Sequence, residues 1–188
     1  MQMETDRLIL RDFVPDDAAA VASYRADERY WRFYGEPGDI LAGAREHVEL
    51  FIGWQQAEPR THFQLAIVVK ETGRLIGNCG LRLRDQVSYG FSSLHEADIG
   101  YELDPAYWGR GYATEAVSAL VDFGFSQRSL HRVWTYCIAD NEPSWRLMER
   151  IGMRREGLLK QNVLHQGQWA DTLVYGLVAE EWASIRPT

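Results

Sequence analysis

The residue types and spacing best suited to chemistry lie in the segment 99–116. A strand-like apolar stretch ends at Pro105, and a loop with two glycines, Gly109 and Gly111, leads straight into a strong helix former. Glycines at such a junction let the backbone approach a ligand closely, and the first N–H groups of the helix have no intrahelical acceptor. An oxyanion, above all a phosphate, is therefore the expected ligand of this loop.

Three interpretations of the glycine loop differ in what they require after Gly111. A Walker A loop needs Lys and then Ser or Thr, but Tyr112-Ala113 follow here, which excludes it. A dinucleotide fingerprint needs a small residue where Thr114 stands and an acid about 20 residues further on, so a nucleotide-dependent oxidoreductase is only a weak alternative. The third interpretation is a plain strand-to-helix turn that binds nothing.

Hydrophobic periodicity and turn residues place the elements that must hold this loop. We expect strands over 8–10, 63–69, 75–81, 98–103 and 131–138, and helices over 18–24, 40–56, 113–124 and 141–152. A polar loop covers 86–95, and two closing strands around the turn 165–168 form a hairpin that ends near Trp182. Because a helix intervenes, the strand over 131–138 should run parallel to that over 98–103. The pattern predicts an α/β (α+β) fold whose mixed sheet is mostly antiparallel, with one central parallel pair.

Length and composition predict one globular domain over residues 1–188. Of these residues, 46% are hydrophobic and 25% are charged, as in ordinary soluble proteins. The net charge of -7 disfavours nucleic acid as the main partner. No apolar run approaches the ~20 residues that span a bilayer. The opening residues do not resemble a secretory signal, so we expect a cytoplasmic protein. Cys79 and Cys137 lie in apolar strand-like runs without metal-ligand spacing, which predicts buried thiols and no metal.

Three groups of motifs, taken in their order and spacing, carry a family resemblance over nearly the whole chain. They are Glu4-Thr5-Asp6-Arg7-Leu8-Ile9-Leu10-Arg11; Ile99-Gly100-Tyr101 with the stretch from Trp108 to Ala116; and Asn141-x-x-Ser144 with Gly152-Met153-x-x-Glu156-Gly157. In this arrangement the chain resembles the GNAT N-acetyltransferase superfamily, and most closely its RimJ/RimL-type branch of ribosomal-protein N-terminal acetyltransferases. The resemblance implies the GNAT fold, in which the central parallel strands splay apart and helices flank the sheet. It also implies acetyl-CoA as cofactor, with CoA as product.

The resemblance assigns cofactor-binding roles residue by residue. The pyrophosphate would lie on Gly109, Arg110, Gly111, Tyr112, Ala113 and Thr114. The pantetheine arm would pair with the backbone of Tyr101, Glu102 and Leu103, and Asn141 would hydrogen-bond the arm while also serving as a helix N-cap. Arg110 adds charge near the pyrophosphate or is simply an exposed loop arginine. Trp108 stands where the wider superfamily has Gln or Arg, and it is expected to pack the loop against the sheet.

The catalytic acid is the first point at which this sequence departs from the wider superfamily. A tyrosine on the last helix commonly protonates the departing thiolate there, and the matching residue here is Met148, which cannot donate a proton. The RimJ/RimL type offers Ser144 instead. Ser144 is thus a candidate acid or else an ordinary residue of the first helical turn.

The general base is the second point of departure. One acetyltransferase group has a glutamate where Tyr136 stands, and another has one at or beside Ala97. Asp98 and then Glu96 are the remaining candidates, unless both are solvated charges at a strand end. His165 on the closing hairpin is a further candidate.

The acceptor is an amine. By family layout, Tyr30, Trp31, Phe33 and Tyr34 lie over the acceptor site, and their alternative role is core packing. We expect direct acetyl transfer in a ternary complex to a primary amine, either the N-terminal α-amine of a protein or peptide or a small-molecule amine. A non-catalytic acyl-CoA-binding module is the alternative function. The closing strands are also suited to pairing in a homodimer.

Overall fold

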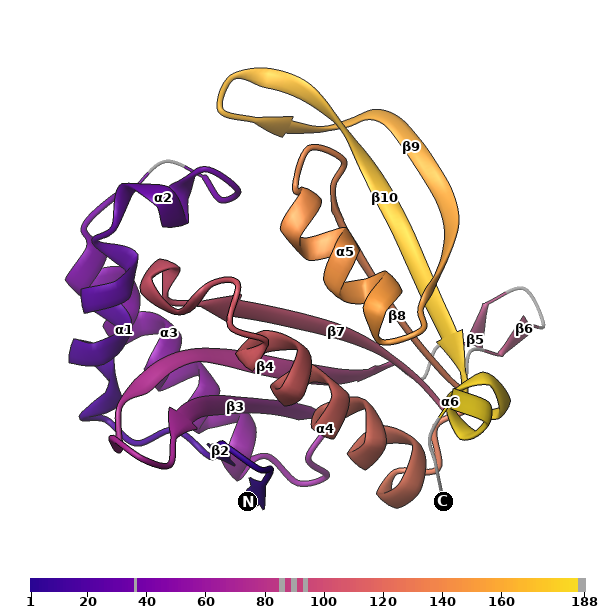
Figure 1. Cartoon of the computed structure of the whole chain (residues 1–188), viewed down its shortest axis with the longest axis horizontal. Coiled ribbons are helices and arrows are strands. Elements are labelled where there is room, and N and C mark those ends of the chain that lie inside the picture. Colours follow the sequence, from indigo (N-terminus) through magenta and orange to yellow (C-terminus); the bar gives the residue numbers. More distant parts are fainter. Residues whose placement is uncertain (36, 85–86, 89–90, 93–94, 186–188) are drawn as a thin grey trace. The chain divides into compact units, whose positions relative to one another are not determined.

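The computed structural model describes residues 1–35, 37–84, 87–88, 91–92 and 95–185. The described residues form a mixed α/β fold (Figure 1) with an eight-stranded sheet in the order β1-β2-β3-β4-β7-β8-β10-β9, and a separate pair, β5-β6. Where the register of a strand pair is defined, the pair is antiparallel, except for β7 with β8, which are parallel. The predicted fold class is confirmed.

The contacts divide the chain into two compact units. Unit 1 comprises 1–82 and 100–120, and unit 2 comprises 83–99 and 121–188. Strands β4 and β7 and helix α4 each contribute residues to both units. A single domain over 1–188 stays a prediction.

Unit 1 holds the first part of the sheet and the helices next to it. Its elements are β1 (Gln2–Glu4), β2 (Leu8–Arg11), α1 (Asp17–Arg25), α2 (Glu28–Trp31), α3 (Ile40–Gln56), β3 (His62–Val69), most of β4 (Leu75–Arg84), the end of β7 (Glu96–Leu103), the 3₁₀ turn η1 (Pro105–Tyr107) and the start of α4 (Tyr112–Gln127). The N-caps of α2 and α3 are Asp27 and Asp39, whose side chains accept backbone N–H groups of the first turn.

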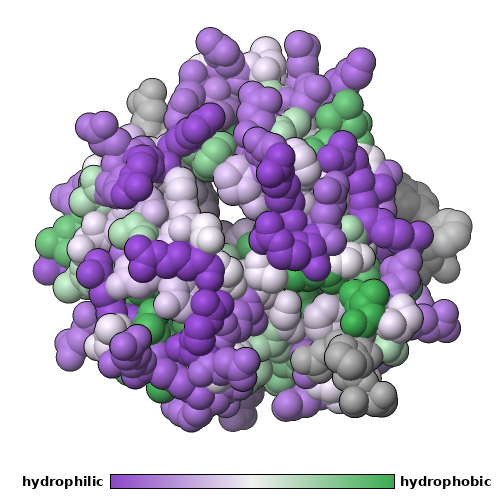
Figure 2. Space-filling model, in the orientation of Figure 1, coloured by the Kyte–Doolittle hydropathy of each residue, from purple (hydrophilic) through white to green (hydrophobic). Residues whose placement is uncertain are grey.

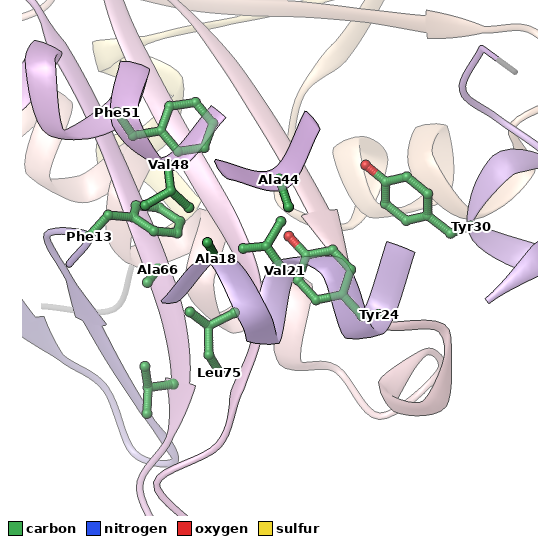
Figure 3. Packing of buried hydrophobic residues seen from close by; sticks show 11 residues of the cluster. Phe13, Ala18, Val21, Tyr24, Tyr30, Ala44, Val48, Phe51, Ala66 and Leu75 are labelled. Atoms are coloured by element: carbon green, nitrogen blue, oxygen red, sulfur yellow. The ribbon is translucent and has the colours of Figure 1, made fainter. Parts of the chain in front are cut away.

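The core of unit 1 lies where α1 and α3 pack together beside β3 (Figure 3). Phe13 and Phe51 meet there with their ring centroids 5.1 Å apart, and Val21 and Val48 come from the facing helices. Burial of these side chains explains why the helical pattern over 40–56 predicts the observed helix so well, since one face of α3 has an apolar partner.

Unit 2 holds the end of the sheet. Its elements are β5 (Val87–Ser88), β6 (Phe91–Ser92), the start of β7, the end of α4, β8 (Arg132–Ile138), α5 (Glu142–Arg150), β9 (Arg154–His165), β10 (Gln168–Val178) and α6 (Ala179–Ile185). Tyr175 on β10 is fully buried, and its hydroxyl donates to Glu149 of α5 at 2.8 Å, so α5 covers this face of the strand.

Two expectations about unit 2 need correction. The closing hairpin does not continue to near Trp182, because β10 ends at Val178 and α6 follows. Two acids begin that helix, and Glu181 Oε2 accepts the backbone N–H of Val178 at 3.1 Å, which stabilises the start of the helix. The segment 86–95, expected to be a polar loop, contains β5 and β6, two strands of two residues each that pair with one another. Residues 86, 89–90 and 93–94 lie outside the described residues.

Both cysteines are buried free thiols, as expected. Burial raises the pKa of Cys79 to about 12 and that of Cys137 to about 11. At Cys137 a hydrogen bond with Ser144 offsets part of this rise.

On the face drawn in Figure 2, hydrophilic side chains cover most of the surface. No helix in the described part of the chain is long and apolar enough to cross a membrane.

Candidate active site

The glycine loop of unit 1 is held from the strand that precedes it. Asp104 follows β7 directly and accepts the backbone N–H of Ala106 at 2.8 Å, which begins η1. The indole N–H of Trp108 donates to Leu103 O at 2.8 Å, so this side chain fixes the loop to the end of the strand, as expected. The φ angles of Gly109 and Gly111 are 74° and 79°. Residues with a side chain disfavour such left-handed values.

Helix α4 begins directly after Gly111. Glu115 N donates to Gly111 O at 3.0 Å, a hydrogen bond of the first turn of α4. The first N–H groups of a helix in general have no acceptor within the helix. A Cβ at Gly109 would meet no atom of the described residues within 4 Å, so among these residues the space beside it is open. An open approach, two left-handed glycines and a helix N-terminus together form an arrangement that binds phosphate groups.

Arg110 does not extend into this space as a free cation. Its guanidinium lies over the ring of Tyr107, 5.3 Å from the centroid, and its carbonyl accepts a hydrogen bond from Arg7 Nη1 at 3.0 Å.

The strand before the loop carries a buried carboxylate, Glu102, for which the sequence predicted only a backbone role. The Glu102 side chain is 10% exposed and forms an ion pair with Arg25 at 2.7 Å. Three more donors reach it: the Tyr24 hydroxyl and Asn78 Nδ2, each at 2.5 Å, and the Tyr30 hydroxyl. Glu102 therefore joins α1, α2 and β4 to β7.

The charge of Glu102 changes its surroundings. Burial raises the pKa of Tyr24 and of Tyr30, and the nearby carboxylate raises both further, so these hydroxyls stay protonated and donate to Glu102. Burial alone would lower the pKa of Arg25, but the charge and hydrogen bond of Glu102, together with Tyr24 and Tyr30, outweigh it and raise the pKa. Close contact between β4 and β7 needs Gly77, because a Cβ there would collide with Glu102 O.

The four aromatic residues expected at the acceptor site do not share one environment. Tyr30 is 3% exposed and belongs to the core cluster (Figure 3), and its hydroxyl donates to Glu102. Tyr34 is half-buried and stacks on Tyr30 at 4.4 Å, with its hydroxyl 3.4 Å from Tyr101 O. Trp31 is also half-buried and donates its indole N–H to Arg25 O at 2.6 Å; Phe33 is half-buried beneath the Arg32 guanidinium.

In unit 2 the turn from β8 to α5 brings Asn141 and Ser144 together. The side chain of Asn141 accepts Ser144 N at 3.2 Å, and a proline occupies the first turn. This contact confirms Asn141 as the N-cap. Ser144 also interacts with Cys137 at the end of β8. Met148, in the same helix, is 1% exposed and packs in the core of its unit.

The candidate bases at the start of β7 are both ion-paired. Asp98 is 5% exposed and accepts Arg84 Nε at 2.7 Å, and the same guanidinium lies over Trp134. Glu96 pairs with Arg132. Neither is a solvated charge free of a partner.

Arg132 extends its ion pair to a second carboxylate, that of Glu156. Gly176 makes this possible, because a Cβ there would collide with the Glu156 carboxylate. Tyr136, which stands where one acetyltransferase group has its glutamate, is 60% exposed, and the further candidate base His165 is half-buried at the end of β9.

The parallel pairing of β7 with β8 is short. Its register covers Glu96–Asp98 opposite Arg132–Trp134, although both strands continue. Directly beyond the last pair, the buried hydroxyl of Thr135 donates to Ile99 O at 2.8 Å. At this point a side-chain hydroxyl of β8 therefore pairs with a backbone carbonyl of β7.

Comparisons with known proteins agree with this arrangement. The family model described as acetyltransferase (GNAT) domain matches residues 7–154. The chain is 31% identical over 182 residues to the uncharacterized N-acetyltransferase YnaD of Bacillus subtilis, covering 97% of this chain and 99% of that protein. It is 25% identical to the [ribosomal protein uS5]-alanine N-acetyltransferase of Escherichia coli, covering 99% of this chain and 95% of that protein.

Among solved structures, Mycobacterium smegmatis RimJ in complex with CoA-disulfide is similar, with a TM-score of 0.77 and 27% identity, covering 93% of this chain and 83% of that one. These matches exclude the oxidoreductase interpretation and do not support a non-catalytic module. The chain belongs to the GNAT family and is an N-acetyltransferase, an enzyme that transfers an acetyl group to an amine.

Proposed function

We propose that this enzyme uses acetyl-CoA to acetylate the N-terminal α-amine of a protein or peptide, by direct transfer. GNAT acetyltransferases use acetyl-CoA, and the residues of the glycine loop suit its pyrophosphate. The observation that carries the proposal is the turn at Gly109 and Gly111, whose left-handed backbone leads into the N-terminus of α4 beside open space.

The residues proposed to hold the cofactor fall into two groups. In unit 1, Gly109–Thr114 would bind the pyrophosphate through backbone N–H groups, and Tyr101–Leu103 would pair with the arm through their backbone. In unit 2, Asn141 would hydrogen-bond the arm. When bound, acetyl-CoA supplies the activated acetyl group.

Ser144 is proposed as the acid because its Oγ can carry a proton at the first turn of α5. Neither cysteine is proposed as a nucleophile. Both thiols are buried, and burial raises the pKa of each, so little thiolate forms near neutral pH.

Two observations support an α-amine as acceptor. The E. coli relative is named for acetylating an alanine of a ribosomal protein, and both candidate bases are already bound by guanidinium groups. A lysine amine of pKa about 10.4 is only about 0.04% neutral at pH 7, whereas an α-amine of pKa about 7.7–8.0 is roughly 10 to 15% neutral. An α-amine can therefore lose its proton to water, without a dedicated carboxylate. Asp98 remains the first candidate base to test.

The experiment is turnover of acetyl-CoA, followed as CoA release, across N-terminal peptides, free lysine, polyamines and aminoglycosides. The proposal predicts release with the peptides above the rate without amine. Release with polyamines or aminoglycosides and none with peptides would contradict the proposed acceptor. An Asp98→Asn variant that keeps most of its activity would agree with water as the proton acceptor.

A further inference from the structure

The N-terminal segment is tied to the first turn of α4 by one carboxylate. Glu115 Oε1 accepts the Thr5 hydroxyl at 2.5 Å and Arg7 N at 2.8 Å, and Oε2 accepts Arg7 Nε at 2.6 Å. Burial would raise the pKa of Glu115, but these hydrogen bonds and the charge of Arg7 outweigh it and lower the pKa. Glu115 is thus an ionised anchor for Arg7.

From this anchor the Arg7 guanidinium reaches the glycine loop. Nη1 donates to Arg110 O at 3.0 Å, the guanidinium lies 4.5 Å from the centroid of Tyr112, and a Cβ at Gly111 would lie 3.4 Å from Nη2. The side chain remains 46% exposed. Arg7 thus lies beside the loop in space, although it is 103 residues away from Arg110 in the sequence.

The hydrogen bond from Arg7 to Arg110 O also fixes the direction of the next backbone N–H group, that of Gly111. In a planar trans peptide, the C=O of Arg110 and the N–H of Gly111 point in opposite directions. Because Arg7 holds the carbonyl on its own side, the N–H of Gly111 is directed away from Arg7. The orientation of a loop N–H group therefore depends on a side chain outside the loop.

We propose that Arg7 is a positioning residue of the cofactor loop: it fixes the loop peptide for binding phosphate and adds positive charge beside it. The inference rests on the proposed use of acetyl-CoA. The sequence alone suggests Arg110 for this charge, but its guanidinium lies on Tyr107. The competing explanation is that Arg7 merely joins the N-terminal segment to α4.

Binding measurements with two ligands separate these explanations. CoA carries phosphates, whereas pantetheine has the same arm without them. The variants are Arg7→Ala and Arg7→Lys, with Lys70→Ala as matched control, since Lys70 pairs with Glu4 at 3.0 Å in the same N-terminal segment but not with the loop. Dissociation constants come from titration calorimetry, and kcat and KM for acetyl-CoA from CoA release.

We expect Arg7→Ala to weaken CoA binding about 10-fold or more, as for the loss of a charged hydrogen-bonding group. Pantetheine affinity and kcat at saturating acetyl-CoA should stay within twofold of wild type. The CoA affinity of Arg7→Lys should lie between those of wild type and Arg7→Ala, because lysine keeps the positive charge but lacks the planar guanidinium group. The difference between Arg7→Ala and wild type should shrink as salt is raised. Lys70→Ala should match wild type.

Two results would overturn the inference: unchanged CoA affinity in Arg7→Ala, or equal losses for CoA and pantetheine, which indicate a general structural defect. If Arg7→Ala does not fold, Arg7→Lys provides the test. The inference then requires that this variant binds CoA more weakly than wild type and binds pantetheine equally well. If the wild-type protein binds no CoA, the proposed function itself is refuted. If the wild type binds CoA and the Arg7→Ala variant binds it equally well, only the inference about Arg7 is refuted.

Discussion

Replacing Glu102 with alanine should destabilise the folded protein by about 3–5 kcal/mol, the cost of leaving one member of a buried ion pair without its partner. The Arg25 side chain is 7% exposed and that of Glu102 is 10% exposed, so water screens this pair little. Nε of Arg25 already has no hydrogen-bond partner among the described residues, which makes loss of the Nη2 contact more costly. For a chain of this size, such a loss lowers Tm by roughly 6 to 20 °C.

The assay is urea unfolding at pH 7, followed by circular dichroism. Glu102→Gln should cost less than Glu102→Ala, because the amide keeps the volume and one acceptor. A double-mutant cycle of Glu102→Gln with Arg25→Met should give a coupling energy of about 1–3 kcal/mol. Glu49 is exposed on α3, so Glu49→Gln is the control and should stay within about 0.5 kcal/mol of wild type.

A loss below about 1 kcal/mol for Glu102→Ala would refute this reasoning, because it is within the range expected for a single neutral hydrogen bond. A coupling energy near zero would show that Arg25 and Glu102 act independently.

Three further predictions concern the acid, a histidine and the thiols. Ser144→Ala should lower kcat about 100-fold or more, as for loss of a general acid, with CoA affinity unchanged; an unaltered kcat would remove this role. The pKa of His47 is lowered by burial and by Arg25, which donates to its Nδ1, so the unfolded chain binds this proton more readily. Stability should therefore fall as pH drops from about 6.5 through the lowered folded pKa, and His47→Gln should remove that part of the pH dependence in unfolding titrations. Cys79 and Cys137 are buried and should resist iodoacetamide at about pH 8 until the protein is unfolded, whereas rapid labelling of the native protein would contradict their burial.

Local signals predicted the frame of the fold. Hydrophobic periodicity and turn residues predicted the observed bounds of α3, Ile40–Gln56, and the expected N-cap Asn141 predicted the start of α5. The parallel pairing of β7 with β8 followed from the intervening helix. Short elements such as β1 and α2 escaped prediction, because elements of so few residues carry no measurable period and are stabilised by tertiary contacts.

Contacts between distant residues could not be predicted. The donors on Glu102 come from α1, α2 and β4, between 24 and 78 residues away. The one signal in the sequence was a glutamate between Tyr101 and Leu103 in the predicted strand 98–103, because a carboxylate needs partners if it is buried. For the same reason the sequence could not show that Asp98 and Glu96 are ion-paired, or that Arg7 reaches the glycine loop.

The most direct test compares two peptides of otherwise equal sequence with acetyl-CoA, one with a free α-amine only and one with a lysine ε-amine only. Initial rates are measured at pH 7 and pH 9, and mass spectrometry locates the acetyl group. If the neutral amine reacts without a dedicated base, the α-amine peptide should be faster by about 200-fold or more at pH 7, and by only about 20-fold at pH 9. A lysine peptide that reacts as fast at pH 7, or no acetylation of either peptide, would contradict an enzyme that acetylates N-terminal amines.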